Sequence, residues 1–160
     1  MKKIFGIIIF ILFIIALTYL NNNEIIVEKE ETKLIKCIDG DTAKFLYNNE
    51  EIKVRFLAVN TPEIGENVEP YGEEASKYTC DRLNSAKKIE LELDQESDKY
   101  DKYNRLLAWI FIDGELLQLD LVSQGYAEVK YIYGNYKYLS ELKIAQETAK
   151  NQKIGIWKEK

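Results

Sequence analysis

Two acidic residues and two arginines of this sequence have the types and the settings that phosphate chemistry needs. Asp41 closes the turn sequence Ile-Asp-Gly-Asp, and Glu63 follows Asn-Thr-Pro at the end of an apolar run that contains Arg55. Arg105 ends a polar stretch and leads into a second apolar run. Carboxylates bind hard cations, and guanidinium groups form paired hydrogen bonds with phosphate oxygens. The set indicates metal-assisted chemistry on a phosphate ester.

The run that carries Arg55 alternates like a strand from residue 54 to residue 59. A charged side chain inside such a run must either reach out of the sheet or meet an anion. Pro62 cannot donate to a strand ladder, so the strand ends before it. The end of the strand then presents Asn60, the Thr61 carbonyl and Glu63, all of them oxygen groups suited to a hard cation. The alternative is a solvated turn after a core strand.

Composition excludes several kinds of catalysis. The chain has 160 residues, of which 46% are hydrophobic, which suits one domain with a real core. It contains no histidine, which removes serine–histidine triads and histidine bases. Its two cysteines, Cys37 and Cys80, are too few for a cysteine-rich zinc site, and the sequence leaves open whether they pair. Catalysis must use carboxylates, arginines, tyrosines and a hard metal.

The first 20 residues form a separate segment. Lys2 and Lys3 precede an uncharged, isoleucine-rich run over residues 4–20. This layout predicts a secretory signal or an uncleaved N-terminal membrane anchor, with the rest of the chain outside the cell. Residues 21–32 are acidic and polar and are interpreted as a linker. The domain is expected over residues 33–160.

Within that domain, periodicity predicts five strands and three helices. A hairpin over 33–47, with its bend at Gly40, is followed by a tight turn at Asn48-Asn49 and by a third strand over 52–59. Helical patterns cover 72–85, 116–124 and 138–152, and strands are expected over 86–93 and 106–112. Five strands with a helix between the third and the fourth follow the order of an OB-fold barrel, a mainly β architecture with helices added (α+β).

From about residue 33 to residue 157 the chain resembles the staphylococcal nuclease family. The resemblance rests on Ile-Asp-Gly-Asp-Thr at 38–42, Val-Arg-Phe-Leu-Ala-Val-Asn-Thr-Pro-Glu at 54–63 and Lys-Tyr-Asn-Arg at 102–105, in the order and spacing of the family. It implies the same OB-fold and a calcium-dependent extracellular nuclease. Such an enzyme hydrolyses DNA and RNA with little base specificity and leaves 3′-phosphates.

The resemblance also implies a role for each matching residue. Asp41 matches a calcium ligand, and the Thr61 carbonyl matches a backbone ligand. Asn60 departs from the family, which has aspartate there, so one charged oxygen is missing and calcium binding should be weaker. Glu63 matches the proposed general base, whose role is either to activate or to position the attacking water.

The remaining matches concern the nucleotide. Arg55 and Arg105 match the two phosphate-binding arginines, which stabilise charge in the transition state. Lys102 and Tyr103 match contacts to a nucleotide phosphate. The aromatic side of the nucleotide pocket is matched by Tyr131 and Tyr133. Asn104 replaces a glycine, and asparagine tolerates a left-handed backbone better than most residues do.

Net charge argues against a large basic binding face. The whole chain carries −5, and removing Lys2 and Lys3 with the first segment leaves −7 on the exported part. Nucleic-acid binders usually show a basic footprint. We therefore expect local binding of single strands. The domain is expected to be a monomer, with a membrane contact only if the first segment stays uncleaved. The alternatives are a binding module that kept the fold and lost catalysis, and a surface adhesion domain.

Overall fold

The computed structural model describes residues 11, 28–65 and 68–158. The predicted signal or anchor over residues 1–20 lies outside the described residues except for Ile11, as does most of the predicted linker. In the part of the chain that is described, no helix combines the length and the apolar character needed to cross a bilayer.

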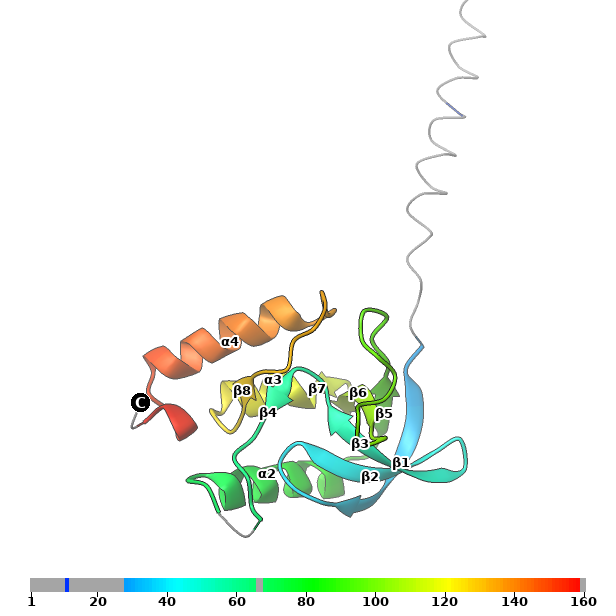
Figure 1. Cartoon of the computed structure of the whole chain (residues 1–160), viewed down its shortest axis with the longest axis horizontal. Coiled ribbons are helices and arrows are strands. Elements are labelled where there is room, and N and C mark those ends of the chain that lie inside the picture. The colour runs from blue at the N-terminus through cyan, green and yellow to red at the C-terminus, as the bar shows by residue number, and fades with distance from the viewer. Residues whose placement is uncertain (1–10, 12–27, 66–67, 159–160) are drawn as a thin grey trace, which may run out of the picture.

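Five strands close into a barrel, which confirms the predicted OB-fold. The strands are β1 (Glu30–Cys37), β2 (Thr42–Tyr47), β3 (Glu50–Phe56), β5 (Ile89–Glu92) and β6 (Leu106–Ile112). Neighbours β1–β2, β2–β3, β1–β5 and β5–β6 are antiparallel, and a parallel pairing of β3 with β6 closes the barrel (Figure 1). Closure leaves few exposed strand edges.

Strand β1 begins earlier than the sequence predicts. Its first residues come from the segment 21–32, which the sequence indicates to be a linker, and Glu30 pairs with Leu91 of β5. The tight turn after β2 lies at Asn48 and Asn49, as predicted, with φ of 51° and 63°. Asparagine adopts this left-handed conformation more readily than other non-glycine residues.

The third strand is shorter than predicted, and the prediction of a strand over 52–59 is wrong in its last part. Strand β3 ends at Phe56, and Ala58 takes a left-handed φ of 58°. The chain then re-forms as β4 (Val59–Asn60), which pairs with β8 (Glu128–Val129). A left-handed residue other than glycine costs roughly 1–2 kcal/mol, and the hydrogen bonds of the new pairing offset this. The bend redirects Asn60 and its successors.

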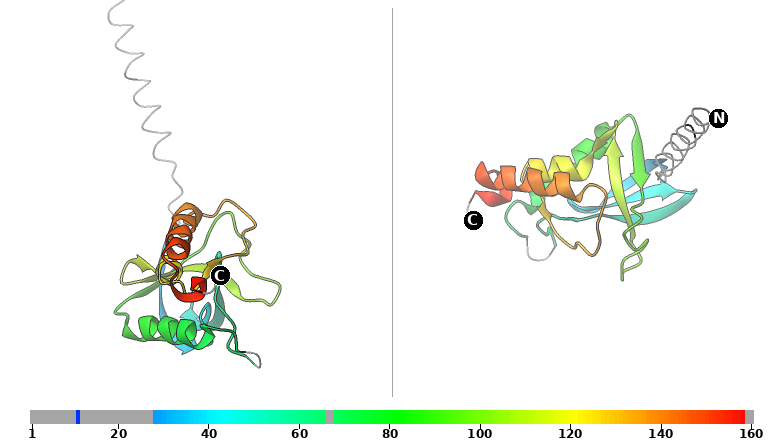
Figure 2. Two further views of the ribbon diagram at one scale, coloured as in Figure 1. Left: turned by 90° about the vertical axis from the view of Figure 1, so that its left-hand side faces the viewer. Right: turned by 90° about the horizontal axis from the view of Figure 1, so that it is seen from above.

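Three helices cover the barrel, close to the predicted positions. They are α2 (Gly72–Ser85), α3 (Leu117–Ser123) and α4 (Leu139–Asn151). The short strand β7 (Glu115–Leu116) pairs with β6 and leads directly into α3, and the last described element is the 3₁₀ turn η1 (Gly155–Trp157). Helix α4 packs on α3, whereas α2 lies on the opposite side of the molecule (Figure 1, Figure 2).

The core fills the barrel and the layer under α3. Trp109, Phe45 and Phe56 are among its largest fully buried side chains. Gln118 of α3 is also fully buried, and its amide accepts a hydrogen bond from Ile110 N and donates one to Ala108 O. A buried amide with both ends bonded costs little to desolvate, so Gln118 fixes α3 against β6.

Candidate active site

Asp41 lies in the turn between β1 and β2 and has only 6% of its surface exposed. Its Oδ1 forms an ion pair with Nη1 of Arg55 at 2.8 Å and accepts a hydrogen bond from Thr42 Oγ1 at 3.1 Å. Its Oδ2 accepts from the Thr61 N–H at 2.9 Å. The buried arginine of β3 therefore meets an anion, which is one of the two outcomes that its place in an apolar strand predicts.

The protonation of Asp41 reflects competing effects of its surroundings. Burial is the largest effect and raises the pKa, because a desolvated carboxylate is less stable, and all the effects together bring the pKa from 3.8 to about 6. The Arg55 guanidinium lowers the pKa, Asp39 raises it, and the bonds from Thr61 and Thr42 lower it. The carboxyl thus keeps a charge near neutral pH mainly through Arg55.

Asn60 and Thr61 join this cluster through the bend after β3. Asn60 Oδ1 accepts a weak hydrogen bond from Arg55 Nη2 at 3.3 Å. Thr61 is buried and packs against Gly40, where a Cβ would come within 2.6 Å of Thr61 Oγ1. Only glycine fits at position 40, because any larger residue would push Thr61 away from Asp41. The structure therefore brings together Asp41, Arg55, Asn60 and Thr61.

Glu63 lies just outside this cluster, with its side chain exposed. Its backbone is fixed by a short loop, because its N–H donates to Glu69 Oε2 at 3.0 Å and its carbonyl accepts from the Glu69 N–H at 2.9 Å. Among the residues that the structure describes, no polar contact joins the Glu63 carboxylate to Asp41 or to either arginine. Its exposed carboxylate is therefore accessible to water.

Arg105 is held by a residue that the motifs did not single out. Asp101 Oδ2 lies 2.7 Å from Nε and 2.6 Å from Nη2 of Arg105. Burial alone would raise the pKa of Asp101, but bonds from Arg105 and from the Tyr103 N–H to the carboxylate bring this pKa below its ordinary value. The only sequence signal for this contact was the position of Asp101, four residues before Arg105. The same spacing also fits an aspartate that merely caps a turn with its side chain.

Thr42 links the two arginines. Its hydroxyl donates to Asp41 Oδ1 and accepts a long contact of 3.5 Å from Arg105 Nη1. Arg105 therefore lies beside the pair formed by Asp41 and Arg55, as the sequence predicts for a site with two arginines. Asn104, which precedes Arg105, has a φ of 57°, the left-handed conformation that a glycine would adopt there.

Exposed tyrosines flank both guanidinium groups. The ring centre of Tyr131 lies 5.7 Å from the Arg55 guanidinium carbon, and that of Tyr103 lies 5.4 Å from the Arg105 carbon. Tyr103 also contacts the ammonium of Lys102 at 4.9 Å. Tyr133 is 83% exposed and has no such contact with either arginine. Two aromatic faces thus lie beside the cationic groups of the site.

The oxygen donors fit a hard cation in kind but carry little charge. Asp41 supplies one carboxylate, and Asn60 and Thr61 supply neutral oxygens. Within the described residues, no group of three or more acidic or sulfur-bearing side chains gathers to hold a metal. Arg55 also contacts both Asp41 and Asn60. The donor set therefore suits a hard cation by its oxygen chemistry and offers that cation one charged ligand.

Together, the closed five-stranded barrel and the two arginines beside a buried aspartate define an OB-fold domain with a cluster of charged side chains on one side of the barrel. Residues 53–159 match the family model described as staphylococcal nuclease homologue, and the chain belongs to this family. This membership agrees with the family that its motifs indicate.

Relatives of this chain are named endonuclease or thermonuclease. The chain is 41% identical over 138 residues to endonuclease YncB of Bacillus subtilis, covering 81% of this chain and 64% of the relative. It is 41% identical to the SPbeta prophage-derived endonuclease YokF of the same organism, covering 81% of this chain and 45% of the relative. It is 35% identical to the thermonuclease of Staphylococcus hyicus, covering 78% of this chain and 74% of the relative. The chain thus spans less than two thirds of the first two relatives.

Proposed function

We propose that this chain is an exported, calcium-dependent nuclease that hydrolyses single-stranded DNA and RNA with little base specificity and leaves 3′-phosphates. The observation that carries the proposal is the position of Arg105 beside the Asp41–Arg55 pair, joined to it through the Thr42 hydroxyl. Membership of the nuclease family and the names of the relatives support hydrolysis of a phosphodiester.

In this proposal the metal ligands are the Asp41 carboxylate, the Asn60 amide oxygen and the Thr61 carbonyl. When bound there, calcium supplies Lewis-acid polarisation of the phosphate. Arg55 and Arg105 donate to the non-bridging phosphate oxygens and stabilise the additional negative charge that develops when water attacks. Glu63 orients that water or removes its proton, for which an exposed carboxylate on a fixed backbone is suited.

The tyrosines account for the substrate class. The rings of Tyr103 and Tyr131 lie beside the two arginines, so bases next to the bound phosphate can stack on them. Every base has a π-face, so stacking selects unpaired bases without selecting among them. Tyr133 and Lys102 extend this surface outward. We expect the domain to act as a monomer.

Two features support export. Cys37 and Cys80 form a disulfide, which resolves the pairing that the sequence leaves open, and such bonds persist in oxidising compartments. The N-terminal sequence has the layout of a signal or an anchor, which would place the domain outside the cell or on the outer face of the cytoplasmic membrane.

Hydrolysis of a labelled single-stranded oligonucleotide, measured with calcium and with chelator, tests the function. We expect calcium-dependent cleavage that falls by ~10²-fold or more in Glu63→Gln and in Arg105→Ala. Glu74→Gln, an exposed acid on α2, serves as the matched control and should retain activity. Absence of cleavage by the folded parent would favour the non-catalytic binding module. Full activity of either site variant would instead refute the role assigned to that residue.

A further inference from the structure

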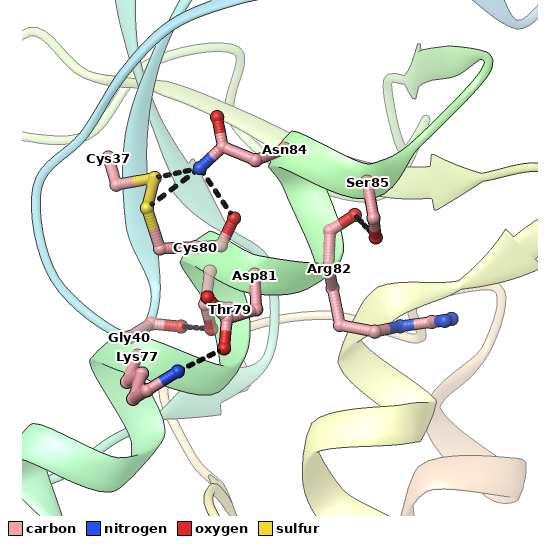
Figure 3. The surroundings of a disulfide bond; sticks show 9 residues. All are labelled: Cys37, Gly40, Lys77, Thr79, Cys80, Asp81, Arg82, Asn84 and Ser85. Atoms are coloured by element: carbon pink, nitrogen blue, oxygen red, sulfur yellow. Dashed lines mark hydrogen bonds and ion pairs between the residues drawn. A yellow bond between two sulfur atoms is a disulfide. The ribbon is translucent and has the colours of Figure 1, made fainter.

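The disulfide joins the start of the Asp41 turn to helix α2. Cys37 is the last residue of β1 and lies four positions before Asp41, whereas Cys80 lies within α2, 43 residues further along the chain. The two Cα atoms are 5.7 Å apart. Figure 3 shows the bond beside Gly40 and Thr79, where the turn passes along the helix.

The residue before Cys80 fixes the other end of the same turn. Thr79 has no exposed surface, and its hydroxyl donates to the Gly40 carbonyl at 2.7 Å. Two consecutive residues of α2 therefore hold the turn at Cys37 and at Gly40, on either side of Asp39 (Figure 3). Gly40 also packs directly against Thr61, and the Thr61 N–H donates a hydrogen bond to Asp41 Oδ2.

A third helix residue supports the disulfide itself. Asn84, one turn after Cys80, donates from Nδ2 to the Cys80 carbonyl at 2.8 Å. The same nitrogen lies 3.2 Å from Cys80 Sγ and 3.9 Å from Cys37 Sγ (Figure 3). This amide bonds the cross-link to the last turn of α2.

Helix α2 has independent attachments elsewhere. Tyr78 donates to Asp120 at 2.8 Å, and Arg82 forms ion pairs with Asp120 at 3.0 Å and with Glu115 at 2.9 Å. These contacts reach α3 and β7 and do not involve the turn. Breaking the disulfide therefore leaves α2 attached on that side, while the turn that carries Asp41 keeps the bond from Thr79 and loses its covalent link to the helix.

We propose that the Cys37–Cys80 disulfide and the Thr79 hydroxyl position the carboxylate of Asp41 from outside the site, so that cation binding depends on the disulfide being oxidised. The metal part of this statement rests on the proposed function. These three side chains are positioning residues, since none of them reaches the cation or the substrate. Reduction by a dithiol breaks the S–S bond, transfers two electrons and two protons to give two thiols, and converts the dithiol to its own disulfide.

Calcium titration by calorimetry on the full chain tests the metal part. We expect the Cys37→Ser/Cys80→Ser double variant, the dithiol-reduced parent and Thr79→Val to bind calcium about 10-fold or more weakly, as loss of supporting contacts around metal ligands commonly does. Thr79→Ser keeps the hydroxyl and should restore binding. Cleavage rates at saturating calcium should change little.

A stability control separates positioning from general weakening. Leu142→Val alters a buried residue of α4, far along the chain from the turn, and lowers stability without touching it. We expect its calcium affinity to equal that of the parent. If Leu142→Val weakened calcium binding as much as Thr79→Val did, or if neither the double variant nor Thr79→Val weakened it, the proposal would be overturned.

Amide hydrogen exchange in chelator tests the positioning without any metal. The Thr61 N–H bonds Asp41 Oδ2, so its exchange should become faster in the double variant and in Thr79→Val, while the Ile110 N–H, bonded to buried Gln118, stays unchanged. Unchanged exchange at Thr61 would overturn the positioning role. If exchange at Thr61 becomes faster in the variants as expected but the parent binds no calcium, the positioning role would stand and the proposed function would be overturned.

Discussion

The guanidinium of Arg55 lies 2.8 Å from Oδ1 of Asp41, and its other terminal nitrogen lies 3.3 Å from Oδ1 of Asn60. One cationic side chain thus contacts two of the three residues assigned to the metal. A cation at these oxygens must share them with Arg55, and with a single carboxylate the shared charge is small. If the site binds calcium as proposed, the charge at position 60 should therefore set the affinity.

We expect Asn60→Asp to bind calcium more tightly than the parent, because it adds a second charged oxygen ligand. Calorimetric titration of both forms measures the difference. Asn48→Asp adds the same charge at an exposed turn and should leave the affinity unchanged. Equal or weaker binding by Asn60→Asp would place residue 60 outside the metal shell.

Replacing Asp101 tests how Arg105 is positioned. In Asp101→Asn the amide oxygen still accepts backbone N–H groups, but the ion pair with the guanidinium is lost. We expect turnover to fall by about 10- to 100-fold, since small misplacements of a catalytic group have effects of this size. Steady-state kinetics at saturating calcium give the result. Asp98→Asn, on an exposed position of the same loop, is the control, and a loss of the same size there would count against positioning.

The raised pKa of Asp41 predicts a pH dependence of stability in chelator. Between its ordinary value of 3.8 and about 6, the folded protein binds more protons at this carboxyl than the unfolded chain does. The contribution of Asp41 to the free energy of unfolding therefore falls as pH rises through this interval. Relative to Asp41→Asn, the parent should lose stability from about pH 4 to about pH 6 and show a constant difference above about pH 7.

Urea denaturation of both forms across this range measures that difference. The comparison matters more than either curve, because other carboxyls such as Asp101, whose pKa is lowered, contribute with the opposite sign. A difference that does not change with pH would mean that Asp41 titrates as it does in the unfolded chain.

Salt dependence tests the size of the cationic surface. With contacts from Arg55, Arg105 and Lys102 alone, the slope of log affinity against log salt should be roughly −2, at about −0.7 per neutralised phosphate on a single strand. Binding of a short single strand to Glu63→Gln at constant calcium measures it, and a duplex should bind less well. A slope steeper than about −5 would reveal a large basic face. Preference for duplex would refute a site that holds one phosphate of a single strand between the two arginines.

The barrel order and the helices were predictable because their patterns are local. The break at Ala58 was not, since no glycine or proline marks it and the apolar alternation continues through it. Its cause is the pairing of β4 with β8, a strand almost 70 residues further along the chain. Local pattern cannot reveal a partner at that distance.

The candidate site likewise has features that the sequence predicts and features that it does not. Motif order predicted that Asp41, Arg55, Asn60 and Thr61 belong together, and the structure gathers them. The disulfide depended on how β1 lies along α2, so spacing alone could not decide it. Asp101 was overlooked because a charged residue in a polar loop looks like any solvated one until its contact with Arg105 is seen.

The disulfide also encloses much of the site within one covalent loop. Cys37 and Cys80 bracket Asp41, Arg55, Asn60 and Glu63, and the connection from β4 to α2 within this loop is exposed at Gly65 and Val68. If a protease cut the chain there, the two fragments would remain joined by the sulfur–sulfur bond. They would separate on a denaturing gel only after reduction, so one cut in this connection would not by itself part Asp41 from Arg105.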